Sequence, residues 1–300
     1  MGTDSFFDFF LMLLLVNLVF CYKKIMLLQD KRLNLESKIF KLKSAIVAFS
    51  GGIDSTLVLA VANKVLSGRV LAVTAKSDSL PERELQAAQA LTKALGINHK
   101  VIKTEEMSSP DYLKNPGNRC YYCKSELYTK LAMVSSQHKI TSILNGTNLD
   151  DLGDHRPGIL AAKEAGIISP LVESQLNKQD VRNLARDMGL TNWEKPALAC
   201  LSSRIPYGQP VTAKKLSMVD EAEEIFLEEG FKEIRVRHYG DMARIELLKT
   251  EIPSLMKNGL YEKTIRRLKK IGFQKVTIDP EGYRSGSLNE ALDLNNKKTV

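Results

Sequence analysis

Cysteine is scarce in this sequence, with four residues in a chain of 300. So few thiols exclude a disulfide-stapled scaffold. The pair Cys120 and Cys123, three positions apart, indicates a metal or redox site in a reducing compartment. Internal repeats and low-complexity segments are also missing from the sequence. A chain of this length has room for one large core or two modest domains.

Long apolar runs are limited to the N-terminus, where residues 6–22 are almost wholly apolar and two lysines follow. The run is short for a membrane helix, which needs ~20 apolar residues. A signal peptide would carry its basic residues before the apolar stretch. We therefore expect Met26 to be the true start and residues 1–25 to be a translation artefact. A membrane-associating N-terminal helix is the alternative.

Charge is unbalanced toward the positive, with a net charge of +8. The hydrophobic share of 44% and the charged share of 26% are typical of a soluble globular protein. The excess of lysine and arginine suits ligands that carry phosphate and would also suit RNA, although it says nothing about the fold.

A glycine-rich turn, Ser-Gly-Gly-Ile-Asp-Ser at residues 50–55, follows an apolar strand pattern and precedes a helix pattern. Its glycines let backbone amides approach an anion, and a helix N-terminus adds amides and a positive dipole end. No lysine follows the glycines, so this is not a Walker A loop. The turn resembles the PP-loop of the ATP pyrophosphatase superfamily, whose members split ATP between its α and β phosphates. An ordinary tight turn is the alternative.

Strand and helix patterns alternate from residue 45 onward. Strands are expected at residues 45–49, 70–74, 99–103 and 142–145, and helices at residues 56–66, 82–95, 124–135 and 178–188. This alternation predicts an α/β fold in which helices cover both faces of a parallel sheet. Ligands on such sheets bind at the carboxyl ends of the strands.

A linker with two prolines and a glycine near residue 206 leads to a second pattern. Helices at residues 213–229 and 261–271, with strands at residues 233–238, 243–248 and 275–278, predict a small antiparallel α+β layer. The expected organisation is a PP-loop domain at residues 26–205, an α+β substrate or oligomerisation domain at residues 206–287, and a polar tail at residues 288–300.

Three cysteines, Cys120, Cys123 and the distant Cys200, could form one metal centre. Zinc would normally take four protein ligands, and only Cys21 of the N-terminal segment remains. Three thiolates and one vacant iron suit a 4Fe–4S cluster better. Two alternatives stay open. Cys200 could act alone as a nucleophile, with Arg204 favouring its thiolate, or the Cys-x-x-Cys spacing could arise by chance.

Seven blocks carry a more specific resemblance, and the last four are not generic to PP-loop proteins. They lie at residues 47–56, 154–158, 189–193, 202–208, 234–238, 243–246 and 282–286. Over residues 27–287 the chain resembles the LarE family, the ATP-dependent sulfur transferases that mature the nickel-pincer cofactor of lactate racemase.

The resemblance implies that ATP adenylates a carboxylate of a pyridinium-3,5-biscarboxylic acid mononucleotide and that sulfur then displaces AMP. In one branch of the family a single cysteine gives up its own sulfur. In another branch three cysteines hold a 4Fe–4S cluster whose extra sulfide is the donor. The three cysteines here favour the cluster branch, with sacrificial transfer from Cys200 as the alternative. ATP, Mg²⁺ and the cluster are the implied cofactors of a cytoplasmic homo-oligomer.

Site residues follow from that chemistry. Candidates for binding the nucleotide are Ser50, Gly51, Gly52, Asp54, Ser55, Thr56, Ala75 and Gly146. Asp54 would orient Mg²⁺. Asp151 would help to hold the ion, or would cap a helix instead. Ala75 ends the second strand, where it would contact adenine or serve only as a core residue. The candidate catalytic residues are Cys200, Asp54 and Arg204.

Candidates for binding the substrate lie in and beyond the linker. They are Ser203, Arg204, Glu223, Arg235, Arg237 and Glu246. Arg235 and Arg237 are two positions apart on a predicted strand, so both point to one face, where paired arginines suit a phosphate clamp. A solvated sheet face paired with Glu246 is the alternative.

Other functions fit less well. A PP-loop tRNA thiolase would also adenylate its substrate, but no RNA-binding module is recognisable, and a small-molecule substrate without nucleic acid is expected. An amide-forming synthetase of the GMP or NAD type needs an ammonia source, and no glutaminase is visible in the sequence. A degenerate nucleotide-binding scaffold would be expected to lose Asp54 or the glycines, and both are intact.

Overall fold

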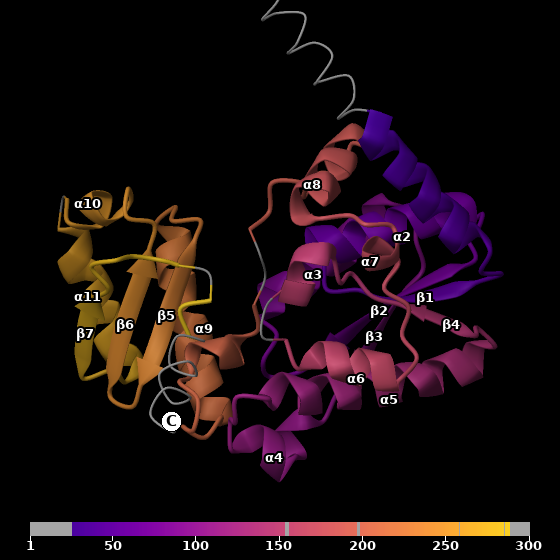
Figure 1. The fold of residues 1–300 in the computed structure, drawn as a ribbon. Coiled ribbons are helices and arrows are strands. Elements are labelled where there is room, and N and C mark those ends of the chain that lie inside the picture. The colour runs from indigo at the N-terminus through magenta and orange to yellow at the C-terminus, as the bar shows by residue number, and fades with distance from the viewer. Residues whose placement is uncertain (1–25, 154–155, 197–198, 258, 285, 289–300) are drawn as a thin grey trace, which may run out of the picture.

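A computed structural model describes residues 26–153, 156–196, 199–257, 259–284 and 286–288. The expectations for residues 1–25 and for the tail after residue 288 lie outside the described residues. The described chain starts with a helix over residues 26–40. Two sheets follow, each with its own helices (Figure 1). No helix in the described ranges has both the length and the apolar character that crossing a membrane requires.

The first sheet has four parallel strands, as the alternating pattern predicts. They are β1 (Ala45–Ala48), β2 (Val70–Lys76), β3 (His99–Lys103) and β4 (Ser142–Leu144), in the spatial order β3-β2-β1-β4. Successive side chains of a strand point to opposite faces of the sheet, and both faces are buried. Ala45 and Val47 belong to one core and Ile46 belongs to the other.

Helices cover both faces of this sheet. On the first face lie the helix over residues 26–40, α2 (Ile53–Val65), α3 (Glu82–Ala94), α7 (Pro170–Glu173) and α8 (Lys178–Asp187), which contribute to one core. On the other face lie α5 (Arg119–His138) and α6 (Gly158–Glu164). The carboxyl ends of β1 and β4 therefore open toward the start of α2, where the glycine-rich turn lies.

Two helices begin earlier than the sequence pattern predicts, and both differences affect candidate sites. The helix expected from residue 56 begins at Ile53, directly after the glycines. The helix expected from residue 124 begins at Arg119, after Pro116 and Gly117. Polar and cysteine residues concealed these first turns from the apolar periodicity. Asp54 and Cys120 thus belong to helix N-termini and not to loops.

The second sheet is mixed, so the expectation of an antiparallel layer is wrong for one strand. Strands β5 (Ile234–Tyr239) and β6 (Met242–Leu247) form an antiparallel hairpin, whereas β7 (Lys275–Ile278) pairs parallel to β6. The crossover helix α11 (Leu260–Ile271) separates β6 from β7, and a helical crossover permits the parallel pairing. With α9 (Ala213–Glu228), it encloses a core around Phe226.

The remaining short helices join these elements. They are η1 (Glu106–Ser108), α4 (Pro110–Leu113), η2 (Leu149–Gly153), η3 (Leu201–Arg204) and α10 (Ile252–Leu255). Tyr112, Leu201, Ile205 and Val219 share a separate small core. Arg83 of α3 forms ion pairs with Asp220 and Glu224 of α9. The segment around η3 and the α9 carboxylates therefore connect the two sheets.

Candidate active site

The glycine-rich turn adopts the conformation that its glycines permit. Gly51 has a φ of +72°, and a Cβ added there would lie 3.2 Å from the Cβ of Ala88 on α3. The Ser55 hydroxyl donates to the Gly52 carbonyl (3.0 Å) and accepts from the Ser50 amide (3.3 Å). The turn is therefore closed by its own side chains, and only glycine fits at position 51 without strain.

The start of α2 places backbone amides beside the glycine-rich turn. Its N-cap residue is Gly52, which has no side chain to cap the first turn. The first amides of a helix have no intrahelical acceptor, and they lie at the positive end of its dipole. Thr56 donates its hydroxyl to the Gly52 carbonyl at 2.9 Å. This turn can therefore bind phosphate through backbone amides.

Asp54 lies between two donors from distant parts of the sequence. Its Oδ2 pairs with Lys178 Nζ at 2.5 Å, and its Oδ1 accepts from Asn148 Nδ2 at 3.0 Å. Asp151 accepts from the Asn148 amide at 3.0 Å and pairs with Arg156 at 2.7 Å. Burial raises the pKa of Asp151, and the charge of Asp54 raises it further. Two carboxylates thus lie close together, and oxygen donors of this kind suit Mg²⁺.

Gly146 explains how the β4 loop reaches this site. A Cβ at Gly146 would lie 2.6 Å from the Ser55 backbone nitrogen, so the loop backbone packs directly against the first turn of α2. The predicted nucleotide residue Ala75 lies within β2, half-buried and opposite Ile102 of β3. The structure therefore brings Gly146 to the glycine-rich turn and leaves Ala75 on the neighbouring strand.

Sequence reasoning missed two residues at this site. Lys178 starts α8, and Asn192 follows that helix. Asn192 Nδ2 donates to the Gly51 carbonyl (3.2 Å) and to Thr56 Oγ1 (3.0 Å), while its buried Oδ1 has no partner among the described residues. The Gly-Leu-Thr-Asn-Trp block of residues 189–193 was the available signal for Asn192. No local pattern marks Lys178.

The three cysteines come from two elements. Cys120 and Cys123 lie in the first turn of α5 and are half-buried, whereas Cys200 precedes η3 and is exposed. Burial raises the pKa of Cys120 and raises that of Cys123 to about 12, and a charge on Cys200 raises both further. The thiols are therefore electrostatic neighbours. Among the described residues, however, no three His, Cys, Asp or Glu groups lie close enough to hold a metal ion.

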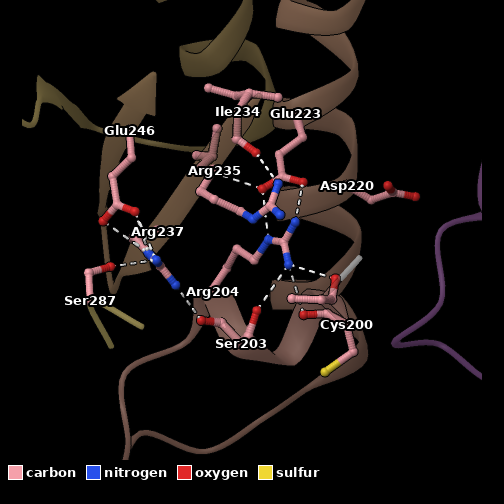
Figure 2. A network of polar contacts seen from close by, with 12 residues as sticks. Cys200, Ser203, Arg204, Asp220, Glu223, Ile234, Arg235, Arg237, Glu246 and Ser287 are labelled. Carbon is pink, nitrogen blue, oxygen red and sulfur yellow. Dashed lines mark hydrogen bonds and ion pairs between the residues drawn. The ribbon is translucent and has the colours of Figure 1, made fainter. Parts of the chain in front are cut away.

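Arg204 connects the Cys200 loop to α9 (Figure 2). It donates to both carboxylate oxygens of Glu223, at 2.8 and 2.9 Å, and to the backbone oxygens of Ala199 (2.8 Å) and Cys200 (3.0 Å). Arg204 and Glu223 are both buried. Such a bidentate pair fixes the geometry of both partners, so the loop that carries Cys200 is held rigidly on this side.

Arg237 and Glu246 form a second buried pair in the same network (Figure 2). Arg237 Nη2 donates to Glu246 Oε2 at 2.8 Å, and Nη1 donates to the Ser203 carbonyl at 2.7 Å. The alternative of a solvated face paired with Glu246 is right about the pairing, but Arg237 is 5% exposed, so the face is not solvated at this residue. Arg235 lies over the Tyr283 ring at 5.1 Å. Desolvation and the nearby Arg204 lower its pKa.

Comparison with known proteins finds related sequences. Residues 28–114 match the model of the NAD synthase family. Over 266 residues the chain is 38% identical to the pyridinium-3,5-bisthiocarboxylic acid mononucleotide synthase of Lactiplantibacillus plantarum, covering 88% of this chain and 96% of that protein. It is 44% identical to an uncharacterized protein of Synechocystis sp. (89% and 99% covered) and 31% identical to one of Methanocaldococcus jannaschii (84% and 95% covered).

The fold and the glycine-rich turn define a PP-loop enzyme that uses ATP. The identity to the Lactiplantibacillus synthase extends over nearly the whole of both chains. The chain belongs to the LarE family, as its sequence blocks predict.

Proposed function

We propose that this enzyme is an ATP-dependent sulfur transferase that acts on a pyridinium-3,5-biscarboxylic acid mononucleotide. ATP adenylates one carboxylate and pyrophosphate leaves. A carbon–sulfur bond then forms as the carbon–oxygen bond to AMP breaks, which gives a thiocarboxylate. The observation that carries the proposal is the 38% identity to the bisthiocarboxylic acid synthase, which spans the phosphate turn, the Cys200 loop and the arginine network alike.

The adenylation half of the reaction is assigned to the glycine-rich turn. Backbone amides at the start of α2 and the hydroxyls of Ser50, Ser55 and Thr56 would bind the phosphates of ATP. Asp54 and Asp151 would hold Mg²⁺, which neutralises the leaving pyrophosphate. Asn148 links the two carboxylates, and each of them pairs with a cation, Lys178 or Arg156, with which the ion would compete.

The substrate is assigned to the arginine network. Arg204, Arg235 and Arg237 face two buried carboxylates, those of Glu223 and Glu246. Guanidinium groups gathered in one network suit the phosphate of a mononucleotide. Ser203 lies beside Cys200, and its hydroxyl accepts from Arg204 at 3.0 Å. The sulfur donor and the phosphate-binding groups would thus share one loop.

Sulfur would come from a 4Fe–4S cluster held by Cys120, Cys123 and Cys200. Thiolate is the ligand that such clusters take, and the three thiols are close enough for their charges to interact. The bound cluster would supply sulfide. Sacrificial transfer from Cys200 is a second candidate, favoured by the exposure of Cys200 compared with the half-buried Cys120 and Cys123.

Anaerobic purification distinguishes these sulfur sources. Iron and acid-labile sulfide should be present, and the intact polypeptide mass should be unchanged after several turnovers with ATP and the biscarboxylic substrate. Loss of the mass of one sulfur from Cys200 would instead establish the sacrificial route. Cys123→Ala should abolish multiple turnovers if the cluster is the donor. Full multiple-turnover activity in that variant would contradict the cluster, and co-purifying tRNA would contradict the small-molecule substrate.

A further inference from the structure

The segment before α5 forms hydrogen bonds with the loop that follows Cys200. Asn115 adopts a left-handed conformation, with φ of +55°. Its side-chain amide donates to the carbonyls of Ile205 (3.2 Å), Pro206 (2.8 Å) and Gln209 (3.0 Å). Its own carbonyl accepts from the Gly208 amide at 2.9 Å. One fully buried side chain therefore fixes a loop that is about ninety residues away in the sequence.

Arg119 extends these hydrogen bonds to Ser202, close to Cys200 in the sequence. Its Nη1 donates to the Ser202 carbonyl at 2.9 Å and to the side-chain oxygen of Asn115. The Tyr112 hydroxyl also meets the Ser202 hydroxyl at 2.5 Å. Ser202 is fully buried and Arg119 is 2% exposed. Arg119 directly precedes Cys120, so a single residue joins the start of α5 to the Cys200 loop.

The charge of Arg119 is unusual for so buried a residue. In the part of the chain that the structure describes, no carboxylate forms an ion pair with it, whereas Arg204 and Arg237 each have a glutamate. Its guanidinium group lies over the Tyr207 ring, 5.8 Å from the ring centroid. Burying a cation is costly unless an anion compensates it.

We infer that Arg119 is a positioning residue of the thiol site, which holds the Cys200 loop against the Cys120–Cys123 turn. The spatial part of this inference is independent of the proposed function. The role of Arg119 in sulfur transfer rests on the proposed function.

Thiol bridging tests the spatial part without ATP or substrate. The reduced full-length chain is treated with dibromobimane, which cross-links two thiols only when they are close, and the products are mapped by peptide mass spectrometry. Bridges from Cys200 to Cys120 or Cys123 are expected. Arg119→Gln should lower their yield about tenfold, because small misplacements of reacting groups have large effects on rate. Lys114→Gln is the matched control, since it removes an exposed charge that pairs only with Asp111.

A second variant keeps the test decisive if Arg119→Gln fails to fold. Arg119→Lys retains the charge but has a shorter side chain that lacks Nη1, the nitrogen that donates to both Asn115 and Ser202. A bridging yield below that of wild type in Arg119→Lys supports the inference. Wild-type yields in every folded Arg119 variant would overturn it.

Activity then distinguishes positioning from general stability. In Arg119→Gln, formation of the thiolated product should fall while substrate-dependent pyrophosphate release continues, because the glycine-rich turn is untouched. A parallel fall in both would assign Arg119 a general structural role and overturn the inference. If Arg119→Gln loses the bridge but the wild-type enzyme forms no thiolated product, the spatial part is supported and the proposed function is rejected.

Discussion

Asp54 shows how single residues are oriented in the candidate site. Its carboxylate is held by Lys178 and by Asn148, so both oxygens are oriented. A magnesium ion at Asp54 would compete with the Lys178 ammonium group for the same oxygen. The displaced ammonium group would then be close to the phosphates, where its charge is useful. Lys178 therefore belongs to the candidate site although no motif contains it.

Gly146 provides a test at the scale of one residue. Gly146→Ala would place a methyl group 2.6 Å from the Ser55 nitrogen, so the loop or α2 must shift. Overpacking of this kind costs about 2 kcal/mol, and we expect a lower free energy of unfolding together with a higher KM for ATP. Urea denaturation and pyrophosphate-release kinetics measure both quantities.

Gly153→Ala is the matched control for this substitution, because an added Cβ there has no heavy atom within 4 Å. It should leave the unfolding free energy and the KM for ATP close to those of wild type. If Gly146→Ala behaves in the same way, the close approach of the β4 loop to α2 is not what shapes the nucleotide site.

At the scale of elements, His99 joins β3 to its neighbours. Its Nε2 lies 2.8 Å from Thr74 Oγ1 on β2, and its Nδ1 lies 3.2 Å from Thr92 Oγ1 on α3. Thr74 Oγ1 in turn donates to the Phe49 carbonyl, which precedes the glycine-rich turn. Desolvation lowers the pKa of His99. The neutral imidazole is therefore the form that the fold stabilises.

This linkage predicts how stability depends on pH. The folded chain releases the His99 proton at a lower pH than the unfolded chain, whose histidine pKa is ~6.5. Between the two pKa values the unfolded chain binds more protons, so the unfolding free energy rises with pH. His99 thus contributes stability above pH ~6.5 that is lost as the pH falls through the lowered folded pKa. His238, whose pKa desolvation also lowers, adds a term of the same sign.

Urea denaturation between pH 5 and 7.5 measures the effect. His99→Gln should show a smaller loss of stability on acidification than wild type, while the control His138→Gln, at the exposed end of α5, should match wild type. An equal pH dependence in all three proteins would mean that other groups control acid stability.

At the scale of the whole molecule, one arginine connects the nucleotide sheet to the arginine network. Arg83 of α3 pairs with Asp220 and Glu224 of α9 and lies 3.7 Å from Glu223, the partner of Arg204. Because these groups are partly exposed, the pairs add little stability, about 0.5 kcal/mol each. They link α3 to α9, whose Glu223 pairs with Arg204 of the Cys200 loop.

Arg83→Gln should therefore uncouple the two half-reactions more than it destabilises the fold. We expect more pyrophosphate per thiolated product, because an adenylate that sulfur attacks more slowly is hydrolysed by water instead. Parallel assays of pyrophosphate and product measure the ratio, with Arg186→Gln on α8 as the control. An unchanged ratio would show that the Arg83 contact does not coordinate the two sites.

The predictions from sequence succeeded where chemistry is local. The four parallel strands follow from period and spacing, and the glycine-rich turn follows from a contiguous string of residues. Helix starts at Ile53 and Arg119 were missed because polar and cysteine residues interrupt the apolar period there. The parallel pairing of β7 was missed because strand direction depends on where the chain returns after α11.

The sequence by itself determined the class of enzyme, because a phosphate-binding turn is built from adjacent residues whose backbone amides do the work. Only the tertiary structure decided which charges compensate one another. Arg204 pairs with Glu223 and Arg237 with Glu246, whereas Arg119 donates to the Ser202 carbonyl and to the Asn115 side chain. Ion pairs depend on distances of a few ångströms across separate elements, and residues 19 positions apart, such as Arg204 and Glu223, meet only after those elements have packed.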